Sequence, residues 1–231
     1  IGEVAVTVVN PASCTNTAAA KFKFRHFKEK QTFAAGYTTQ HVRFADLTRT
    51  GKNDMVVANG PLDGNGSQPA QVYANDGTGT FALRQTLASG AWYHVDVGDV
   101  DAVNGPDVLF GGEPGSRLYL NQGNGWFGLS NVGFNTVSNG DFDAQFVDTD
   151  GDGDLDIVLL HIANYGTPPL RDAIYVNQGG NPVVFTKTDL PANGNVHDHK
   201  MAWADFRRSG RNDIAVNVDT LNYTPKSLNF I

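Results

Sequence analysis

Residues 148–160 read DTDGDGDLDIVLL, an acidic loop that runs directly into an apolar stretch. Aspartate occupies every second position from Asp148 to Asp156, and Gly151 and Gly153 stand between them. Oxygen ligands at alternate positions of a tight loop can all face one hard cation, and glycine permits the backbone angles that such a loop needs. Carboxylates packed this densely repel one another by roughly 1 kcal/mol per close pair in water. The stretch therefore predicts a cation-binding loop that leads into a buried strand.

An oxygen-only ligand set favours calcium. We expect four side chains and one backbone carbonyl to bind the ion, from Asp148, Asp150, Asp152, Asp156 and Asp154 respectively. An EF-hand loop begins in the same way, but Leu159 stands where its last glutamate ligand would be, and a strand pattern replaces the second helix. Because the loop fills the coordination sphere itself, the ion is expected to support the fold rather than to catalyse a reaction.

The same pattern occurs four times, roughly fifty residues apart. Each copy has an aspartate and a second aspartate at the start of an apolar run, and the first three copies continue with an alternating run that ends in Asn-x-Gly and a further apolar segment. The aspartate pairs are Asp46 and Asp54, Asp99 and Asp107, Asp148 and Asp156, and Asp205 and Asp213. Asn-x-Gly between apolar runs is a hairpin signal. The unit is therefore a four-stranded antiparallel sheet, and tandem sheets of this length predict a β-propeller.

We expect an all-β fold and one β-propeller domain over residues 1–231. About five repeats are predicted, at approximately 1–36, 37–88, 89–138, 139–192 and 193–231. The first repeat lacks its first strand and the last lacks its fourth strand. Either the ring closes with incomplete end blades, or the chain is part of a larger ring.

The other three acidic loops vary the ligand pattern. The loop after Asp46 keeps its end aspartates but loses the carboxylates between them, and the loop after Asp205 places Arg207 at a ligand position. A guanidinium at that position could substitute for the charge of an ion. The loop with Asp99, Asp101 and Asp107 is intermediate, and whether it holds a second ion stays open at this level.

These residues resemble the FG-GAP/VCBS repeat, which builds the calcium-binding propellers of integrin α subunits and of several fungal lectins. The resemblance extends over nearly the whole chain and is most specific at residues 148–156. It implies the propeller fold and calcium ligation by Asp148, Asp150, Asp152, Asp156 and the carbonyl of Asp154. The fungal members add sugar binding as an implication.

A ligand is expected on the face opposite the calcium loop, where the loops between second and third strands and between repeats emerge. Recognition commonly uses variable loops on a rigid frame. Aromatic faces for a sugar ring and polar groups for its hydroxyls are predicted at Trp92, Tyr93, His94, Glu113, Asn164, Tyr165, Arg171, Asp198 and His199. The position five residues before the first aspartate is polar in every copy, which predicts a lining position; it holds His41, His94, Asp143 and Lys200.

The leading functional hypothesis is a calcium-stabilised, carbohydrate-binding propeller, a lectin without catalysis, whose partners are glycans or glycoproteins. One alternative is a protein–protein adhesion or scaffold propeller of the integrin-α type. Another is a glycosidase or polysaccharide lyase, for which Asp96, Asp143 and Asp198 could converge on the axis. No nucleophile motif of the G-x-S-x-G kind is present.

Composition narrows the partners. The net charge of −7 argues against nucleic acid and against anionic membrane surfaces, which require clustered basic residues. No stretch has the length and apolarity of a membrane-spanning helix, so no membrane insertion is expected. The calcium loop favours a secreted or extracellular setting, and the formation of a homo-oligomer stays open.

Overall fold

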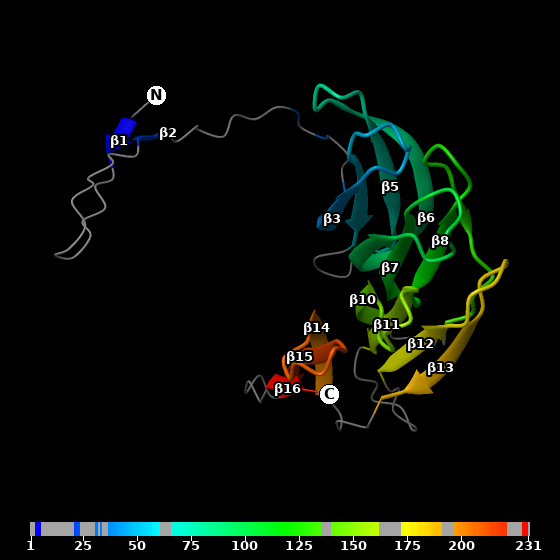
Figure 1. Cartoon of the computed structure of the whole chain (residues 1–231). Coiled ribbons are helices and arrows are strands. Elements are labelled where there is room, and N and C mark those ends of the chain that lie inside the picture. Colours follow the sequence, from blue (N-terminus) through cyan, green and yellow to red (C-terminus); the bar gives the residue numbers. More distant parts are fainter. Residues whose placement is uncertain are drawn as a thin grey trace. The chain divides into compact units, whose positions relative to one another are not determined.

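The computed structural model describes residues 3–5, 21–23, 31, 33, 37–60, 66–134, 140–161, 172–190, 196–220 and 228–230. All regular structure in these residues is β-strand, and the strands pair in antiparallel sheets (Figure 1). No helix long and apolar enough to cross a bilayer occurs among them. The predicted all-β class is confirmed.

Two compact units are distinguished, residues 1–34 and residues 35–231. In the first, β1 (Glu3–Ala5) pairs with β2 (Lys21–Lys23), which are segments of two of the three strands predicted there. The last of these three strands would fall near residues 31–33, which lie partly outside the described residues, and neither Gln31 nor Phe33 is in a strand.

The second unit contains the four repeats that carry the pair of aspartates. Its first two sheets share one strand, β6. The strand order is β3 (Thr39–Ala45), β4 (Asp54–Asn59), β5 (Gln68–Asn75), β6 (Phe81–Gly98), β7 (Asp107–Glu113), β8 (Arg117–Asn121) and β9 (Phe127–Leu129). The amino-terminal half of β6 pairs with β5 as the fourth strand of one sheet, and its carboxyl-terminal half pairs with β7 as the first strand of the next. The predicted repeat boundary between residues 88 and 89 falls inside this strand.

The third sheet has the order β10 (Asp141–Val147), β11 (Asp156–His161), β12 (Ala173–Asn177) and β13 (Phe185–Asp189). The fourth consists of β14 (Val196–Ala204), β15 (Asp213–Thr220) and β16 (Leu228–Phe230), which are the three strands expected of a repeat without its fourth strand. The four-stranded, antiparallel unit inferred from the sequence is therefore the unit of the structure.

Apolar clusters lie between successive sheets. Phe110 and Val108 of β7 belong to the cluster shared with the first sheet, whereas Leu109 between them belongs to the cluster shared with the third sheet. Likewise Leu159 of β11 faces the second sheet and Leu160 faces the fourth. Every residue of β4 and β11 is buried. A strand covered on both faces needs a continuous apolar run, which explains why these segments do not alternate in the sequence.

An asparagine ends the third strand of each of the first three sheets and connects the sheet to its surroundings. Asn121 donates from Nδ2 to the carbonyl of Pro106 at 3.1 Å and to the carbonyl of Leu47 in the preceding repeat at 3.0 Å. Its Oδ1 accepts from the backbone N–H of Gly123 at 2.9 Å. Asn177 repeats the long-range bond, to the carbonyl of Val100 at 2.9 Å. The Asn-x-Gly motif therefore closes a turn, and at Asn121 and Asn177 it also joins neighbouring sheets.

Replacing Asn121 should separate these two roles. Asn121→Ala leaves two buried carbonyls without a donor, and we expect a loss of about 3 kcal/mol in the free energy of unfolding. Asn75→Ala is the matched control, because among the described residues the Nδ2 of Asn75 bonds within its own repeat, to the carbonyl of Asn53. A loss of about 1 kcal/mol is expected. Urea denaturation measures both, and equal losses would contradict a role of Asn121 between sheets.

Candidate functional site

Each acidic loop is built on the buried aspartate that starts the second strand. Asp156 is fully buried, and its Oδ1 accepts from the backbone N–H of Asn177 at 2.8 Å while its Oδ2 accepts from the N–H of Thr149, also at 2.8 Å. The hydroxyl of Thr149 donates to the same oxygen. Asp54 and Asp107 make the equivalent pair of backbone contacts. One carboxylate thereby holds the loop, the second strand and the end of the third strand together.

Asp148, Asp150 and Asp156 each place a carboxylate oxygen within 4.8 Å of the others. Two oxygens that bind one calcium ion from opposite sides, at 2.3–2.6 Å each, lie about that far apart. Asp148 also accepts from the backbone N–H groups of Gly151 at 2.6 Å and Gly153 at 3.1 Å, and both glycines have positive φ, of 84° and 96°. The donor set and its spacing fit a calcium ion, so calcium remains the predicted ligand of this loop.

The pKa of Asp150 is raised, first by partial desolvation and then by the charges of Asp152, Asp156 and Asp148. Asp152 and Asp154 are exposed at the tip of the loop, where Asp152 Oδ1 accepts from the N–H of Asp154 at 2.9 Å. A bound cation would offset this repulsion. In the described residues Asp99, Asp101 and Asp107 form a second cluster of the same size. Burial raises the pKa of Asp107 to about 7.

The fourth loop carries its own cation. The Nε of Arg207 donates to Asp213 Oδ1 at 2.7 Å, and its Nη2 contacts the same oxygen. This oxygen corresponds to the one that receives an asparagine N–H in the other sheets. This hydrogen bond lowers the pKa of Asp213 and raises the pKa of Arg207. The guanidinium thus lies where the sequence placed it, beside the buried aspartate.

A recurrent β-bulge shapes the opposite end of the first strands. The register shifts between Thr39 and His41 in β3 and between Trp92 and His94 in β6, and the same shift occurs in β10 and β14. The unpaired residues are Gln40, Tyr93, Phe142 and His199. A bulge re-aims a side chain, so in the first two sheets both the bulged residue and the one after it face the same space.

These first strands line a cleft of about 590 Å³, which we name the first-strand cleft. Its lining residues are Gln40, His41, Arg43, Tyr93, His94, Gln145, Lys200 and Met201. The strands are neighbours in space: β3 contacts β6, β6 contacts β10, and β10 contacts β14. Of the predicted ligand residues the cleft brings together Tyr93 and His94, and it contains His41 and Lys200 from the predicted lining position.

Hydrogen bonds between first strands fix the cleft. The rings of His41 and His94 stack with centroids 4.1 Å apart, and the Nδ1 of His94 lies 3.0 Å from Asp143 Oδ1 and 2.9 Å from the carbonyl of Ala144. Asp143 Oδ2 accepts from the N–H of Met201 at 3.0 Å. Four polar residues predicted to line a surface therefore form one connected row, from His41 through His94 and Asp143 to Lys200, whose Nζ lies 4.0 Å from Asp143 Oδ1.

Both imidazoles are neutral at physiological pH. Burial, followed by the charges of Arg43 and Lys200, lowers the pKa of His41 to about 4. Burial, followed by Lys200, His41 and Arg43, lowers the pKa of His94 to about 2. Burial also raises the pKa of Asp143, which is fully buried.

The remaining predicted ligand residues are placed as follows. Glu113 ends β7 and accepts from the hydroxyl of Tyr93 at 3.3 Å. Asp198 and His199 are on β14, where the structure describes their backbone and not their side chains. Three more predicted residues lie outside the described residues: Asn164, Tyr165 and Arg171.

Trp92 does not fit the prediction of a sugar-stacking face. The indole is fully buried between the first two sheets, packs against Phe110 at 5.5 Å between ring centroids, and donates to the carbonyl of Ala88 at 3.0 Å. The bulge at Tyr93 sends these two neighbouring rings to different environments. The cleft also contains Gln40, Arg43 and Gln145, which were not among the predicted ligand residues. The one signal that the sequence offered for each of them was its polar side chain within an expected strand.

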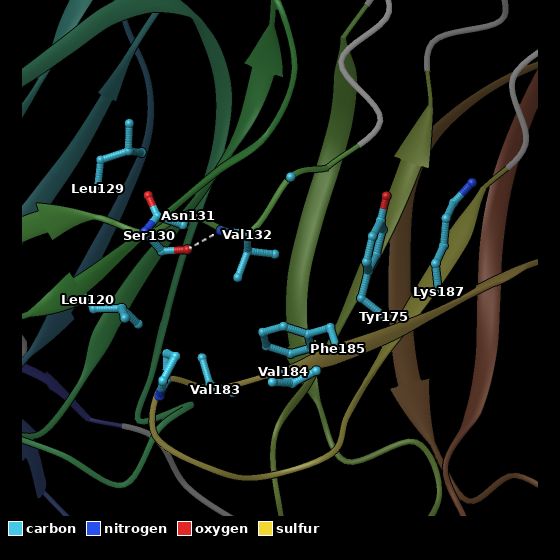
Figure 2. Close-up of a pocket in the computed structure, with 12 residues that line it drawn as sticks. Leu120, Leu129, Ser130, Asn131, Val132, Tyr175, Val183, Val184, Phe185 and Lys187 are labelled. Atoms are coloured by element: carbon cyan, nitrogen blue, oxygen red, sulfur yellow. Dashed lines mark hydrogen bonds between the residues drawn. The ribbon is translucent and has the colours of Figure 1, made fainter.

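A second hollow is an apolar groove of about 630 Å³ between the second and third sheets (Figure 2). Leu120, Leu129 and Val132 line one side, and Val184 and Phe185 of the other sheet face them. Leu129 and Val184 are more than half exposed. Because apolar side chains dominate this groove, it suits a protein surface better than a hydroxyl-rich ligand.

Calcium should stabilise the chain through the loop at residues 148–156. At a free calcium concentration a hundredfold above Kd, binding to the folded state raises the free energy of unfolding by about 2.7 kcal/mol. For a chain of this size, that increase raises Tm by about 5–10 °C. Asp150→Ala should abolish this shift, yet be at least as stable as the unchanged chain in a chelator, because it removes a repelled charge. Asp46→Ala, in the loop without middle carboxylates, should keep the shift. Calorimetry that shows an undiminished shift for Asp150→Ala would refute the ligand assignment.

Acidification should destabilise the first-strand cleft. The unfolded chain takes up protons on histidine below pH 6.5, whereas His41 in the folded chain does so only near its pKa of about 4. The free energy of unfolding therefore falls as pH drops from 6.5 towards 4, by on the order of 1 kcal/mol per pH unit for each buried histidine. Urea titrations at pH 7 and pH 5 measure this loss. His41→Gln should reduce it, and a loss that is identical in the variant would contradict the assignment.

Comparison with known proteins supports the repeat. Residues 104–159 match the family described as FG-GAP-like repeat, and this match spans the second strand of one sheet to the second strand of the next. No curated protein matches the chain. A solved structure of an Agrocybe aegerita lectin, described as recognising non-reducing terminal N-acetylglucosamine, is 16% identical over 98% of this chain and 73% of that chain, with a TM-score of 0.45. The Photorhabdus luminescens Tc holotoxin pore is 22% identical over 82% of this chain and 9% of that chain, with a TM-score of 0.40.

The matched segment contains the acidic loop, the buried aspartate and the Asn-x-Gly turn, and the other sheets repeat that arrangement around Asp54, Asp107 and Asp213. Residues 104–159 are therefore an FG-GAP-like repeat, set among tandem antiparallel sheets of the β-propeller type.

Proposed function

We propose that this protein is a calcium-stabilised, carbohydrate-binding β-propeller without catalytic activity, and that glycans or glycoproteins bind in the first-strand cleft. The observation that carries the proposal is the composition of that cleft. It combines one aromatic ring, that of Tyr93, with amide, imidazole and cationic groups on strands of four successive sheets. Sugars are bound by stacking on an aromatic face together with directional hydrogen bonds to hydroxyls, a combination of the kind found in small-molecule sites.

The rigidity of the cleft supports specific binding. The Oη of Tyr93 donates to Glu113 Oε1, and Gln145 is held on both sides, because its Nε2 donates to Asp143 at 3.1 Å and its Oε1 accepts from the indole N–H of Trp203 at 3.0 Å. Side chains fixed in this way lose little rotamer freedom when a ligand binds. Gln40, by contrast, makes one long contact in the described part of the chain, 3.4 Å to the carbonyl of Gly60, and can turn its amide towards a hydroxyl.

The carboxylates near the cleft favour binding over hydrolysis. Glycoside hydrolysis requires two carboxyl groups that reach the glycosidic bond. Asp143 is fully buried and accepts from Met201 and Gln145. Asp96 accepts from Arg43 at 3.2 Å and from the N–H of Phe146 at 2.9 Å. Both carboxylates therefore support the packing of the first strands. A calcium-dependent fold also suits the secreted or extracellular setting that the sequence predicts.

A second candidate is a protein-binding scaffold, favoured by the apolar groove. Leu129 and Val184 expose large apolar surfaces on its two sides, and exposed apolar patches frequently mark protein interaction sites. This function would use a different surface from the first-strand cleft, so variants can distinguish the two candidates.

A glycan array with the calcium-loaded chain tests the proposed function. We expect binding to a limited set of oligosaccharides, and at least a tenfold loss with Tyr93→Ala, which removes the stacking face. A double change in the groove, Leu129→Ser with Val184→Ser, should leave sugar binding unchanged. A blank array, or binding that is insensitive to Tyr93→Ala but lost in the groove variant, would refute the cleft as the glycan site.

A further inference from the structure

We propose that the first-strand cleft selects acidic glycans, and that the guanidinium of Arg43 and the ammonium of Lys200 recognise the carboxylate of a uronic or sialic acid unit. This inference rests on the proposed carbohydrate-binding function and deepens it. Its basis is the lining of the cleft, which among the described residues includes two cationic side chains and no carboxylate.

The two cations come from different sheets, with Arg43 on β3 and Lys200 on β14, and both line the cleft. The side chain of Lys200 is 56% exposed, and its Nζ is 4.0 Å from the nearest carboxylate oxygen of Asp143. That separation is too long for a hydrogen bond, so none of the described residues accepts from this ammonium group. Asp143 itself already accepts from a backbone N–H and an amide.

Two donors, from Val95 and from Arg43, compete for the ring of His41. The backbone N–H of Val95 donates to Nδ1 of His41 at 3.2 Å, while Nη1 of Arg43 approaches Nε2 of the same ring at 2.6 Å. A neutral imidazole has one lone pair and one N–H, so it can accept only one of these two bonds. When it accepts from Val95, the N–H groups of His41 and Arg43 face each other. A ligand carboxylate would accept from both and remove the conflict.

The neighbouring groups do not neutralise both cations. His41 and His94 are uncharged at physiological pH, so neither ring supplies a counter-charge to Arg43 or Lys200. Asp96 balances Arg43 through Nε only, 3.2 Å away. The planar guanidinium can donate to a second carboxylate from its Nη groups, because it offers five N–H donors in a fork that matches carboxylate geometry.

The rest of the protein limits the kind of anion. A net charge of −7 opposes the approach of long, densely charged polyanions. The cleft volume of about 590 Å³ is within the usual size for a small ligand. A single carboxylate on a sugar unit therefore fits the local charge better than a phosphate-rich chain.

The experiment compares matched acids and esters. Oligosaccharides that end in glucuronic, galacturonic or sialic acid, and the methyl esters of the same compounds, are titrated against the calcium-loaded chain by calorimetry. Esterification removes the charge and retains the ring and its hydroxyls. We expect at least one acid to bind ten or more times more tightly than its ester, with an affinity that falls as salt concentration rises.

Variants locate the carboxylate. Lys200→Gln should remove most of the preference for the acid without a change in Tm, because the side chain is largely exposed. Arg43→Lys should weaken the acid and leave the ester unaffected. Lys187→Gln is the matched control, since Lys187 lines the apolar groove and pairs with Asp189 at 2.5 Å; it should change neither ligand.

The outcomes separate this inference from the proposed function. Equal binding of acids and esters, or binding of neutral sugars alone, overturns the inference and leaves the carbohydrate-binding function standing. A preference for acids that persists in Lys200→Gln and Arg43→Lys overturns the assignment of the carboxylate to this cleft. Failure of every acidic and neutral sugar to bind overturns both.

Discussion

A buried aspartate at the start of the second strand is the constraint on which each sheet depends. Asp54, Asp107 and Asp156 are almost or fully inaccessible, yet each carboxylate accepts from a loop N–H on one oxygen and from a third-strand N–H on the other. Burying a carboxylate is costly unless its oxygens are satisfied, and these contacts satisfy them. The side chain therefore specifies where the loop closes and which residue of the third strand pairs beside it.

This arrangement explains how one repeat can carry different loops. The metal-type loop at residues 148–156 surrounds the buried aspartate with further carboxylates, whereas the fourth loop supplies a guanidinium from Arg207 to the same oxygen. The guanidinium brings a positive charge to a buried carboxylate, and the acidic loop brings the capacity to bind a cation there. The first loop uses neither and instead satisfies Asp54 with the N–H and the hydroxyl of Thr48, at 3.0 and 2.9 Å. The frame is constant while the chemistry beside it varies.

Much of the frame could be predicted from sequence because its signals are local. The spacing between aspartates, the Asn-x-Gly turns and the continuous apolar runs of the second strands each follow from hydrogen bonding or burial within one repeat. The position of His41, His94 and Lys200 was recognisable as a lining position for the same reason, whereas Asp143 at the equivalent position is fully buried and does not line the cleft. The calcium ligands and the sugar residues remain predictions.

The cleft itself was harder to infer, because it depends on contacts between repeats. The bulge before His94 has no residue signature, and it separates Tyr93, which lines the cleft, from Trp92, which packs in the core. Two adjacent aromatic residues in a strand look equivalent until the register is known. Arg43 and Gln145 gain their meaning only from partners on another sheet, Asp96 and Met201, and no pattern within a repeat shows that pairing.

The strand β6 belongs to two sheets at once, and its junction leaves no room for a larger residue. A methyl group on Gly90 would lie 2.6 Å from the indole of Trp92 and 2.9 Å from the carbonyl of Glu113. A protease that needs an extended, accessible linker finds none between these two repeats, and tension applied to one is transmitted to the other through a single continuous backbone. These two blades should consequently unfold together as one cooperative block, even though the sequence repeats them as separate units.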